Sequence, residues 1–115
     1  MILADTSVWI DHFRRGNPDL QWLLEAGEVA MHPMVAGELA LGSLSQRTKT
    51  IEFLRNLPSV TPAADDLVMD SIERARLWSL GLGWIDVHLL AASRLAGVPL
   101  WTFDQRLARA TRLRL

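Results

Sequence analysis

Short apolar runs alternate along the chain with longer segments whose apolar residues repeat at helical spacing. The short runs lie at residues 1–4, at 28–32, around Val60 and at 98–103, and each predicts a buried strand. Residues 112–115 add a predicted edge strand. Runs that are apolar throughout, rather than alternating with polar residues, are typical of a sheet covered on both faces.

The segments between these runs place apolar residues on one helical face and carry helix boundary signals. Asp5, Thr6 and Ser7 are good capping residues before the first helix, and Asp19 is the expected cap of the second. Glycine is favoured just after the last turn of a helix, so Gly97 is an expected helix end. The predicted helices span residues 9–13, 19–27, 34–44, 46–57, 65–80, 85–96 and 105–110.

Strands therefore alternate with helices along the whole chain, which is the order of an α/β protein with a parallel sheet. Right-handed crossover connections place helices on both faces of such a sheet. The predicted fold is a three-layer α/β/α sandwich with a short parallel central sheet. We expect one domain over residues 1–115.

Composition narrows the class of protein further. Half of the 115 residues are hydrophobic, enough for a chain of this length to bury a core. The chain has no cysteine, which excludes a disulfide scaffold, thiolate zinc sites and cysteine nucleophiles. No stretch approaches the roughly 20 apolar residues that span a membrane, and no basic leader precedes a long apolar run. We expect a soluble, cytoplasmic protein.

The formal net charge of −1 gives no strongly basic footprint for nucleic acid. Eleven of the twelve basic residues are arginine, and Lys49 is the one lysine. Arginines gather in the last ten residues, where a guanidinium can bind phosphate or suit a helix C-terminus. Both interpretations of this tail stay open. Its members are Arg106, Arg109, Arg112 and Arg114.

Of the four candidate acidic residues, three stand where strands meet helices. Asp5 follows the first predicted strand, Asp104 follows the strand at 98–103, and Asp86 opens the helix that leads back into the sheet. Glu38 lies early in the helix of residues 34–44. The functional crevice of a parallel α/β sheet lies beyond the carboxyl ends of its strands. We expect the carboxylates of Asp5, Glu38 and Asp86 to converge at this edge.

Each acid alone is explained as a helix cap or an exposed side chain. However, Asp5 and Asp86 stand among apolar residues with no Lys or Arg within four positions, and charges near buried segments need partners. Gathered carboxylates repel one another unless a divalent cation neutralises them, and oxygen ligands select Mg²⁺ or Mn²⁺. Together the acids predict a metal site with Asp5 and Asp86 as the principal ligands.

Other polar residues have predicted supporting or structural roles. The hydroxyl groups of Thr6, Ser7 and Thr102 are expected to hydrogen-bond the acidic ligands or a phosphate. His88 stands two residues after Asp86, about 200° further around the helix. We therefore expect His88 to be structural rather than a ligand.

Four blocks of the chain resemble the PIN-domain ribonucleases and, among them, the VapC toxins of type II toxin–antitoxin pairs. The resemblance covers essentially the whole chain, and the four blocks occur in the family order and spacing. Many relatives carry an aromatic residue three or four positions after the last acid, where this chain has Leu107. The blocks are LADTSVWI at 3–10, VAGEL at 35–39, DVHLLAA at 86–92 and LWTFD at 100–104.

This resemblance implies a metal-dependent endoribonuclease that hydrolyses RNA phosphodiester bonds, with Mg²⁺ as the expected cofactor and Mn²⁺ as an alternative. It also implies a homodimer inhibited by a VapB-type antitoxin, with operator DNA bound only through the antitoxin. No membrane partner is expected. The residues that match the family's acidic positions are Asp5, Glu38, Asp86 and Asp104, and Ser7 or Thr102 matches its hydroxyl.

Two other functions stay open from the residues alone. One is a phosphoryl-transfer domain that uses Asp5 as phosphate acceptor, although Lys49 lies far from the last strand and Ser7 replaces the second aspartate of such phosphatases. The other is a non-catalytic module that binds RNA or a protein, with the acids acting as caps. RNA cleavage, acyl-phosphate formation and binding without turnover distinguish the three.

Overall fold

A three-stranded parallel sheet forms the centre of the molecule in the computed structural model, which describes residues 1–113. Its strands are β1 (Ile2–Ala4), β2 (Val29–Ala30) and β3 (Leu100–Trp101), in the order β2-β1-β3. Leu3 is in register with Ala30 on one side and Leu100 on the other. Because the strands are parallel, their carboxyl ends share one edge of the sheet.

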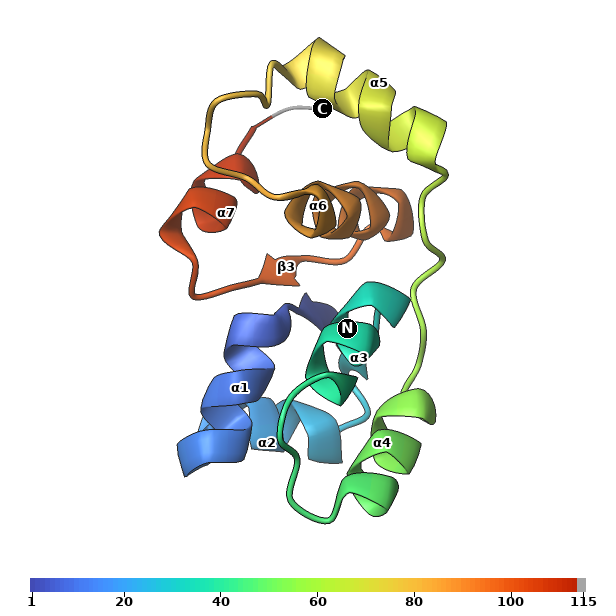
Figure 1. The fold of residues 1–115 in the computed structure, drawn as a ribbon, viewed down its shortest axis with the longest axis vertical. Coiled ribbons are helices and arrows are strands. Elements are labelled where there is room, and N and C mark those ends of the chain that lie inside the picture. Colours follow the sequence, from blue (N-terminus) through green and yellow to red (C-terminus); the bar gives the residue numbers. More distant parts are fainter. Residues whose placement is uncertain (114–115) are drawn as a thin grey trace.

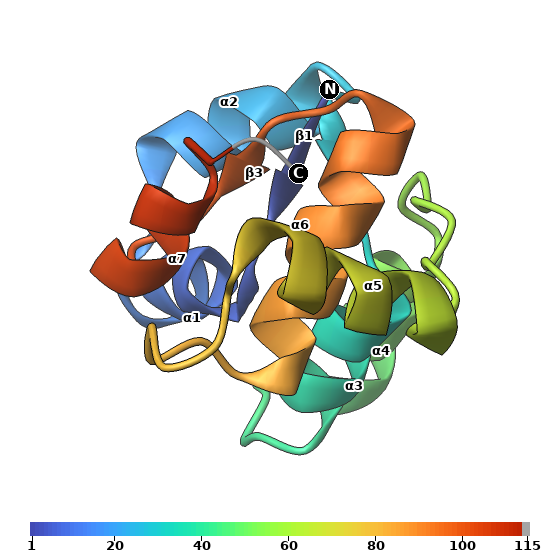
Figure 2. The same ribbon diagram turned by 90° about the horizontal axis from the view of Figure 1, so that it is seen from above.

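Helices cover both faces of this sheet, so the predicted three-layer α/β/α sandwich is confirmed (Figure 1). One group of helices, α1 to α4, covers one face of the sheet. On the other face, α6 lies next to β3 and α5 packs outside α6 (Figure 2). The first group comprises α1 (Thr6–Arg15), α2 (Pro18–Glu25), α3 (Pro33–Ala40) and α4 (Arg47–Arg55). The second comprises α5 (Asp65–Ala75), α6 (Trp84–Ala96) and α7 (Gln105–Ala110).

The starts of α1 and α2 follow from local capping chemistry. Asp5 caps α1, as predicted, and its side chain accepts hydrogen bonds from the backbone of Ser7 and Val8. The predicted cap of α2 was wrong by two residues, because Asn17 rather than Asp19 accepts the hydrogen bond from Leu20. Proline at position 18 then suits the first helical turn, where its missing N–H costs nothing.

The helix predicted over residues 65–80 is shorter in the structure. It ends at Ala75, because Arg76 adopts a left-handed conformation with φ of 53°. The backbone N–H of Leu77 then bonds to the Ile72 carbonyl, and the Leu77 side chain is buried. The residues that follow form turns and bends up to the start of α6.

Two predicted strands are not found as strands. Around Val60 a single parallel bridge joins Met31 to Ser59, and residues 60–64 have no regular secondary structure. Of the edge strand predicted at 112–115, Arg112 and Leu113 lie in a turn and a bend, and the other two positions lie outside the described residues.

The core has two parts, one on each face of the sheet. Leu3, Trp9 and Leu20 belong to the part under α1 to α4, whereas Val68 and Leu90 belong to the part between α5 and α6. Leu100 packs against both parts. No helix within residues 1–113 has the length and apolar character needed to cross a membrane.

Candidate active site

The candidate site begins with Asp5, at the carboxyl end of the central strand. Ala4 is in register with Trp101, so the residues that follow them, Asp5 and Thr102, emerge side by side. The Thr102 hydroxyl donates a hydrogen bond of 2.5 Å to Oδ2 of Asp5. Asp5 is 6% exposed, so a carboxylate is held almost out of solvent at this edge.

The other carboxylate oxygen of Asp5 is held by the first turn of α1. Oδ1 accepts hydrogen bonds from the Ser7 N–H at 2.9 Å and from the Ser7 hydroxyl at 2.5 Å. The Ser7 hydroxyl in turn accepts a hydrogen bond of 3.0 Å from the N–H of Phe103. Two segments almost 100 positions apart thereby fix one carboxylate, and this restricts its orientation.

Glu38 projects from the second turn of α3, which packs against α1. Its Oε1 accepts a hydrogen bond of 2.7 Å from the Thr6 hydroxyl. Thr6 directly follows Asp5 in the chain, so this contact places Glu38 close to Asp5. Glu38 itself is exposed.

Asp86 and Asp104 both serve as caps. Oδ2 of Asp86 accepts a hydrogen bond of 2.9 Å from the N–H of Gly83, which precedes α6. Oδ1 of Asp104 accepts from the N–H groups of Arg106 at 2.8 Å and Leu107 at 3.3 Å. The N–H of Asp104 also donates to the Thr102 hydroxyl at 3.0 Å, so Asp104 is joined to the Asp5 network through its backbone.

The structure therefore links Asp5, Thr102 and Asp104 in one network and brings Glu38 to its margin through Thr6. No hydrogen bond within residues 1–113 joins Asp86 to that network. Within the same residues, no group of three or more His, Asp or Glu side chains is close enough to hold a metal ion. The predicted convergence of three carboxylates stays a prediction.

The charges at this edge are poorly balanced. Arg106 Nε lies 3.7 Å from Oδ1 of Asp104. In the described part of the chain, Asp5, Glu38 and Asp86 have no basic nitrogen within the 4.0 Å of an ion pair. The groups that hydrogen-bond Asp5 are hydroxyls and backbone amides, so the candidate ligands at this edge are the carboxylate oxygens. Carboxylate oxygens suit hard divalent cations such as Mg²⁺ and Mn²⁺.

The histidines take no part in this network. His88 is buried in α6, as its predicted structural role requires, and His32 is buried at the start of α3. Burial of the His32 imidazole, together with a smaller effect of His88, lowers its pKa below the usual 6.5. Both rings belong to the core.

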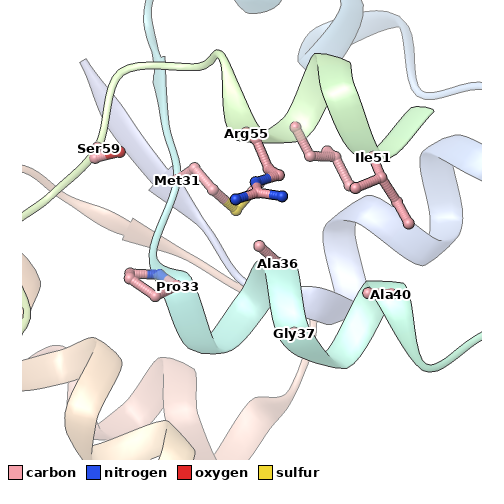
Figure 3. Close-up of a pocket in the computed structure, with 9 residues that line it drawn as sticks. Met31, Pro33, Ala36, Gly37, Ala40, Ile51, Arg55 and Ser59 are labelled. Carbon is pink, nitrogen blue, oxygen red and sulfur yellow. The ribbon is translucent and has the colours of Figure 1, made fainter. Parts of the chain in front are cut away.

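Two surface hollows flank α3, and only one of them reaches the acidic residues. A hollow of about 410 Å³ lies between α3 and α4, with Ala36 and Ile51 in its walls and Arg55 over it (Figure 3). None of its lining residues is acidic. A second hollow of about 370 Å³ includes Glu38 and runs along α1. Sequence reasoning missed this hollow, although the helical spacing of Thr6 and Ile10 could have indicated a shared face beside the site.

Comparison with known proteins identifies the family. A model of the PIN domain matches residues 2–113. Ribonuclease VapC32 from two Mycobacterium tuberculosis strains, CDC 1551 / Oshkosh and ATCC 25618 / H37Rv, is 45% identical over 111 residues, which cover 96% of this chain and 90% of each relative. The crystal structure of PAE2754 from Pyrobaculum aerophilum shares the fold, with a TM-score of 0.69 and 16% sequence identity over 99% of this chain and 87% of that one. The resemblance drawn from the sequence is confirmed, and the chain belongs to the PIN-domain family.

Proposed function

We propose that this protein is a metal-dependent endoribonuclease and the toxin of a type II toxin–antitoxin pair. The observation that carries the proposal is the buried Asp5 carboxylate at the carboxyl end of β1, which is held by hydroxyl groups and has no basic partner within residues 1–113. The chain that carries this carboxylate is 45% identical to a ribonuclease. A buried carboxylate that has hydrogen bonds but no cationic partner still costs stability, so its presence favours a cation-binding role.

A divalent cation fits the donor set at this edge. Oδ2 of Asp5 accepts one hydrogen bond and keeps a lone pair for a cation, whereas Oδ1 already accepts three hydrogen bonds. Carboxylate oxygens are the ligands that Mg²⁺ and Mn²⁺ prefer. We propose Asp5 and Asp86 as the principal ligands, with Glu38 and Asp104 completing the acidic pocket. When bound, such a cation supplies charge stabilisation at the scissile phosphate and an activated water.

The residues of the chain itself then have separate tasks. Thr102 and Ser7 hold the Asp5 carboxylate in one orientation, so this side chain needs little rearrangement to bind a cation. Glu38 and Asp104 orient the attacking water, and Glu38 is the more accessible because it is exposed. No histidine is needed as a general base in this scheme.

The partners of the proposed toxin follow from the same family assignment. We propose a VapB-type antitoxin that inserts a basic side chain among the four acids, and a homodimer as the toxin's own assembly. Operator DNA is bound only through the antitoxin. We propose the cytoplasm as the toxin's place of action.

The proposal is tested by incubating the purified chain with total RNA, with and without Mg²⁺ or Mn²⁺, and sequencing the new RNA ends. We expect cleavage that needs the metal and is lost in Asp5→Asn, which keeps the shape of the side chain but removes its charge. Asp19→Asn is the matched control, because Asp19 is exposed on α2, a helix that contributes nothing to the site. RNA binding without cleavage, or equal cleavage by Asp5→Asn, contradicts the proposal.

A further inference from the structure

One face of α1 leads away from the acidic residues toward an arginine. Thr6, Ile10, Phe13 and Arg14 follow one another at helical spacing and so share this face. Thr6 holds Glu38 at one end. Arg14 lies eight residues further on, about 12 Å along the helix at a rise of 1.5 Å per residue. The face thus connects the candidate site to a positive charge.

Two adjoining hollows follow this face, and we call them together the α1 groove. The first, of about 370 Å³, is lined by Glu38 at the acidic end and by Leu44 of the loop between α3 and α4. The second, of about 320 Å³, continues along the same loop as far as Thr50 on α4. Phe13 and Arg14 line both hollows, so the groove is continuous past these two residues.

The guanidinium of Arg14 is free to bind a ligand. Arg15, its neighbour, donates a hydrogen bond of 2.5 Å to Asp11 Oδ1. This bond, with a second from Asn17, lowers the pKa of the Asp11 carboxyl. Arg14, by contrast, makes no ion pair or side-chain hydrogen bond within residues 1–113. Two adjacent arginines therefore differ, and the unpaired one faces the groove.

Phe13 adds an exposed aromatic surface beside this cation. Its ring packs on the buried Trp9 with centroids 5.8 Å apart, yet Phe13 remains 39% exposed. The buried neighbour holds the ring in place while part of it faces solvent. A nucleobase stacks well on a fixed aromatic ring, and stacking of this kind tolerates any base.

We propose that the α1 groove binds single-stranded RNA on one side of the scissile bond, with Arg14 on a backbone phosphate and Phe13 stacked on a base. This inference rests on the proposed function, because it assigns the path of that same substrate. RNA is favoured as the occupant by the free positive charge of Arg14, the exposed ring of Phe13 and the continuity of the groove with Glu38. A guanidinium fork can bind a phosphate group with two parallel hydrogen bonds.

The test measures binding of a fluorescein-labelled single-stranded RNA of about ten nucleotides by anisotropy at several salt concentrations. Asp5→Asn serves as the background, so cleavage does not interfere. We expect Arg14→Gln to weaken binding about tenfold and to reduce the salt slope by about one, as loss of one phosphate contact predicts. Arg15→Gln is the matched control and should stay within about twofold.

Stacking is tested with Phe13→Leu, which keeps the apolar contact with Trp9, against Phe53→Leu at an exposed phenylalanine outside the groove. We expect weaker binding by about fivefold or more for the first variant only, with unchanged melting temperatures. Equal binding by Arg14→Gln and Arg15→Gln overturns the inference, and so does undetectable RNA binding at low salt. The inference is also overturned if Arg14→Gln weakens binding of a co-expressed antitoxin but not binding of RNA, because the groove is then a protein-binding site.

The two proposals fail in different ways. If the unvaried chain does not cleave RNA but the Arg14 and Phe13 effects on binding appear, the groove stands and the catalytic proposal falls. If cleavage is metal-dependent and neither variant changes RNA binding, the catalytic proposal stands and the groove is wrong.

Discussion

The sheet edge at Asp5 and the core around His32 and His88 both bury polar side chains. The two regions differ in how many hydrogen bonds those side chains make. At the edge, both carboxylate oxygens of Asp5 accept hydrogen bonds from hydroxyl or amide groups. In the core, Nε2 of His32 and Nδ1 of His88 have no hydrogen-bond partner among the described residues. His88 Nε2 lies 3.2 Å from Oδ1 of the exposed Asp65, but without the alignment of a hydrogen bond.

The difference indicates what each region is organised to do. A network that fixes a charged group in one orientation prepares that group for a ligand. Burial lowers the pKa of His32, whose Nε2 has no hydrogen-bond partner, because an unpaired buried charge is costly. The edge should therefore respond to loss of charge and to metal, whereas His32 should respond to acid.

The largest expected effect comes from Asp86→Asn. If Asp86 is only the cap of α6, asparagine replaces it well, because its side-chain oxygen accepts the same hydrogen bond from Gly83. If Asp86 is a metal ligand, we expect RNA cleavage to fall by about 100-fold or more with the melting temperature unchanged. Asp66→Asn, in the exposed first turn of α5, is the control. Full activity in Asp86→Asn would remove this residue from the site.

A smaller loss is expected from Thr102→Val, which keeps the shape of the side chain but removes the hydroxyl that holds Asp5. Loss of a group that orients a ligand typically reduces activity about 10-fold to 100-fold. The loss should appear both in the cleavage rate and in the metal concentration needed for half-maximal activity. Thr61→Val, at an exposed loop position, should change neither. An unchanged metal requirement in Thr102→Val contradicts a positioning role.

The histidine core predicts acid sensitivity. The pKa of folded His32 lies below the usual 6.5, mainly because the ring is buried. Between these two pKa values the unfolded chain binds a proton that the folded chain does not, so the free energy of unfolding falls as the pH drops below about 6.5. His32→Asn retains an acceptor for the Met34 N–H and should flatten this dependence. Melting temperatures from pH 7.5 to 5 provide the check, and parallel curves for both proteins count against it.

The smallest effect is expected from Asp104→Asn. Asparagine caps a helix about as well as aspartate, so the free energy of unfolding should change by less than about 0.5 kcal/mol. Because Asp104 already has Arg106 nearby, we expect its loss to reduce cleavage less than Asp86→Asn does. Denaturant unfolding and the RNA assay measure the two quantities. A loss of cleavage as large as that of Asp86→Asn would make Asp104 an equal member of the site.

The sequence was informative where a local signal decides the structure. Asp5 at the end of a buried strand, with capping chemistry and two hydroxyl residues after it, was enough to predict its place and its contact with Ser7. The left-handed turn at Arg76 could not be predicted, because a non-glycine residue in that conformation has no clear sequence signature and the apolar spacing continues past it. The cap of α2 was missed although the Asn17–Pro18 pair carries a recognised signal.

Contacts between distant segments were the least accessible from the sequence. The Thr6 contact with Glu38 depends on how α1 packs on α3, and the sequence gives no measure of that packing. The α1 groove depends on where the loop after α3 turns, which is also a tertiary property. In this chain, the cap of α1 and the end of β1 were predicted from local chemistry, whereas surfaces between helices emerged only from the structure.

Metal binding by Asp5 is tested most directly by the change in melting temperature when Mg²⁺ or Mn²⁺ is added to the purified chain, to Asp5→Asn and to Asp19→Asn. A cation that binds only the folded site raises the melting temperature, because binding is linked to folding. We expect a clear rise for the unmodified chain and for Asp19→Asn, and loss of most of that rise in Asp5→Asn. An equal rise in all three proteins would show that Asp5 does not hold the metal.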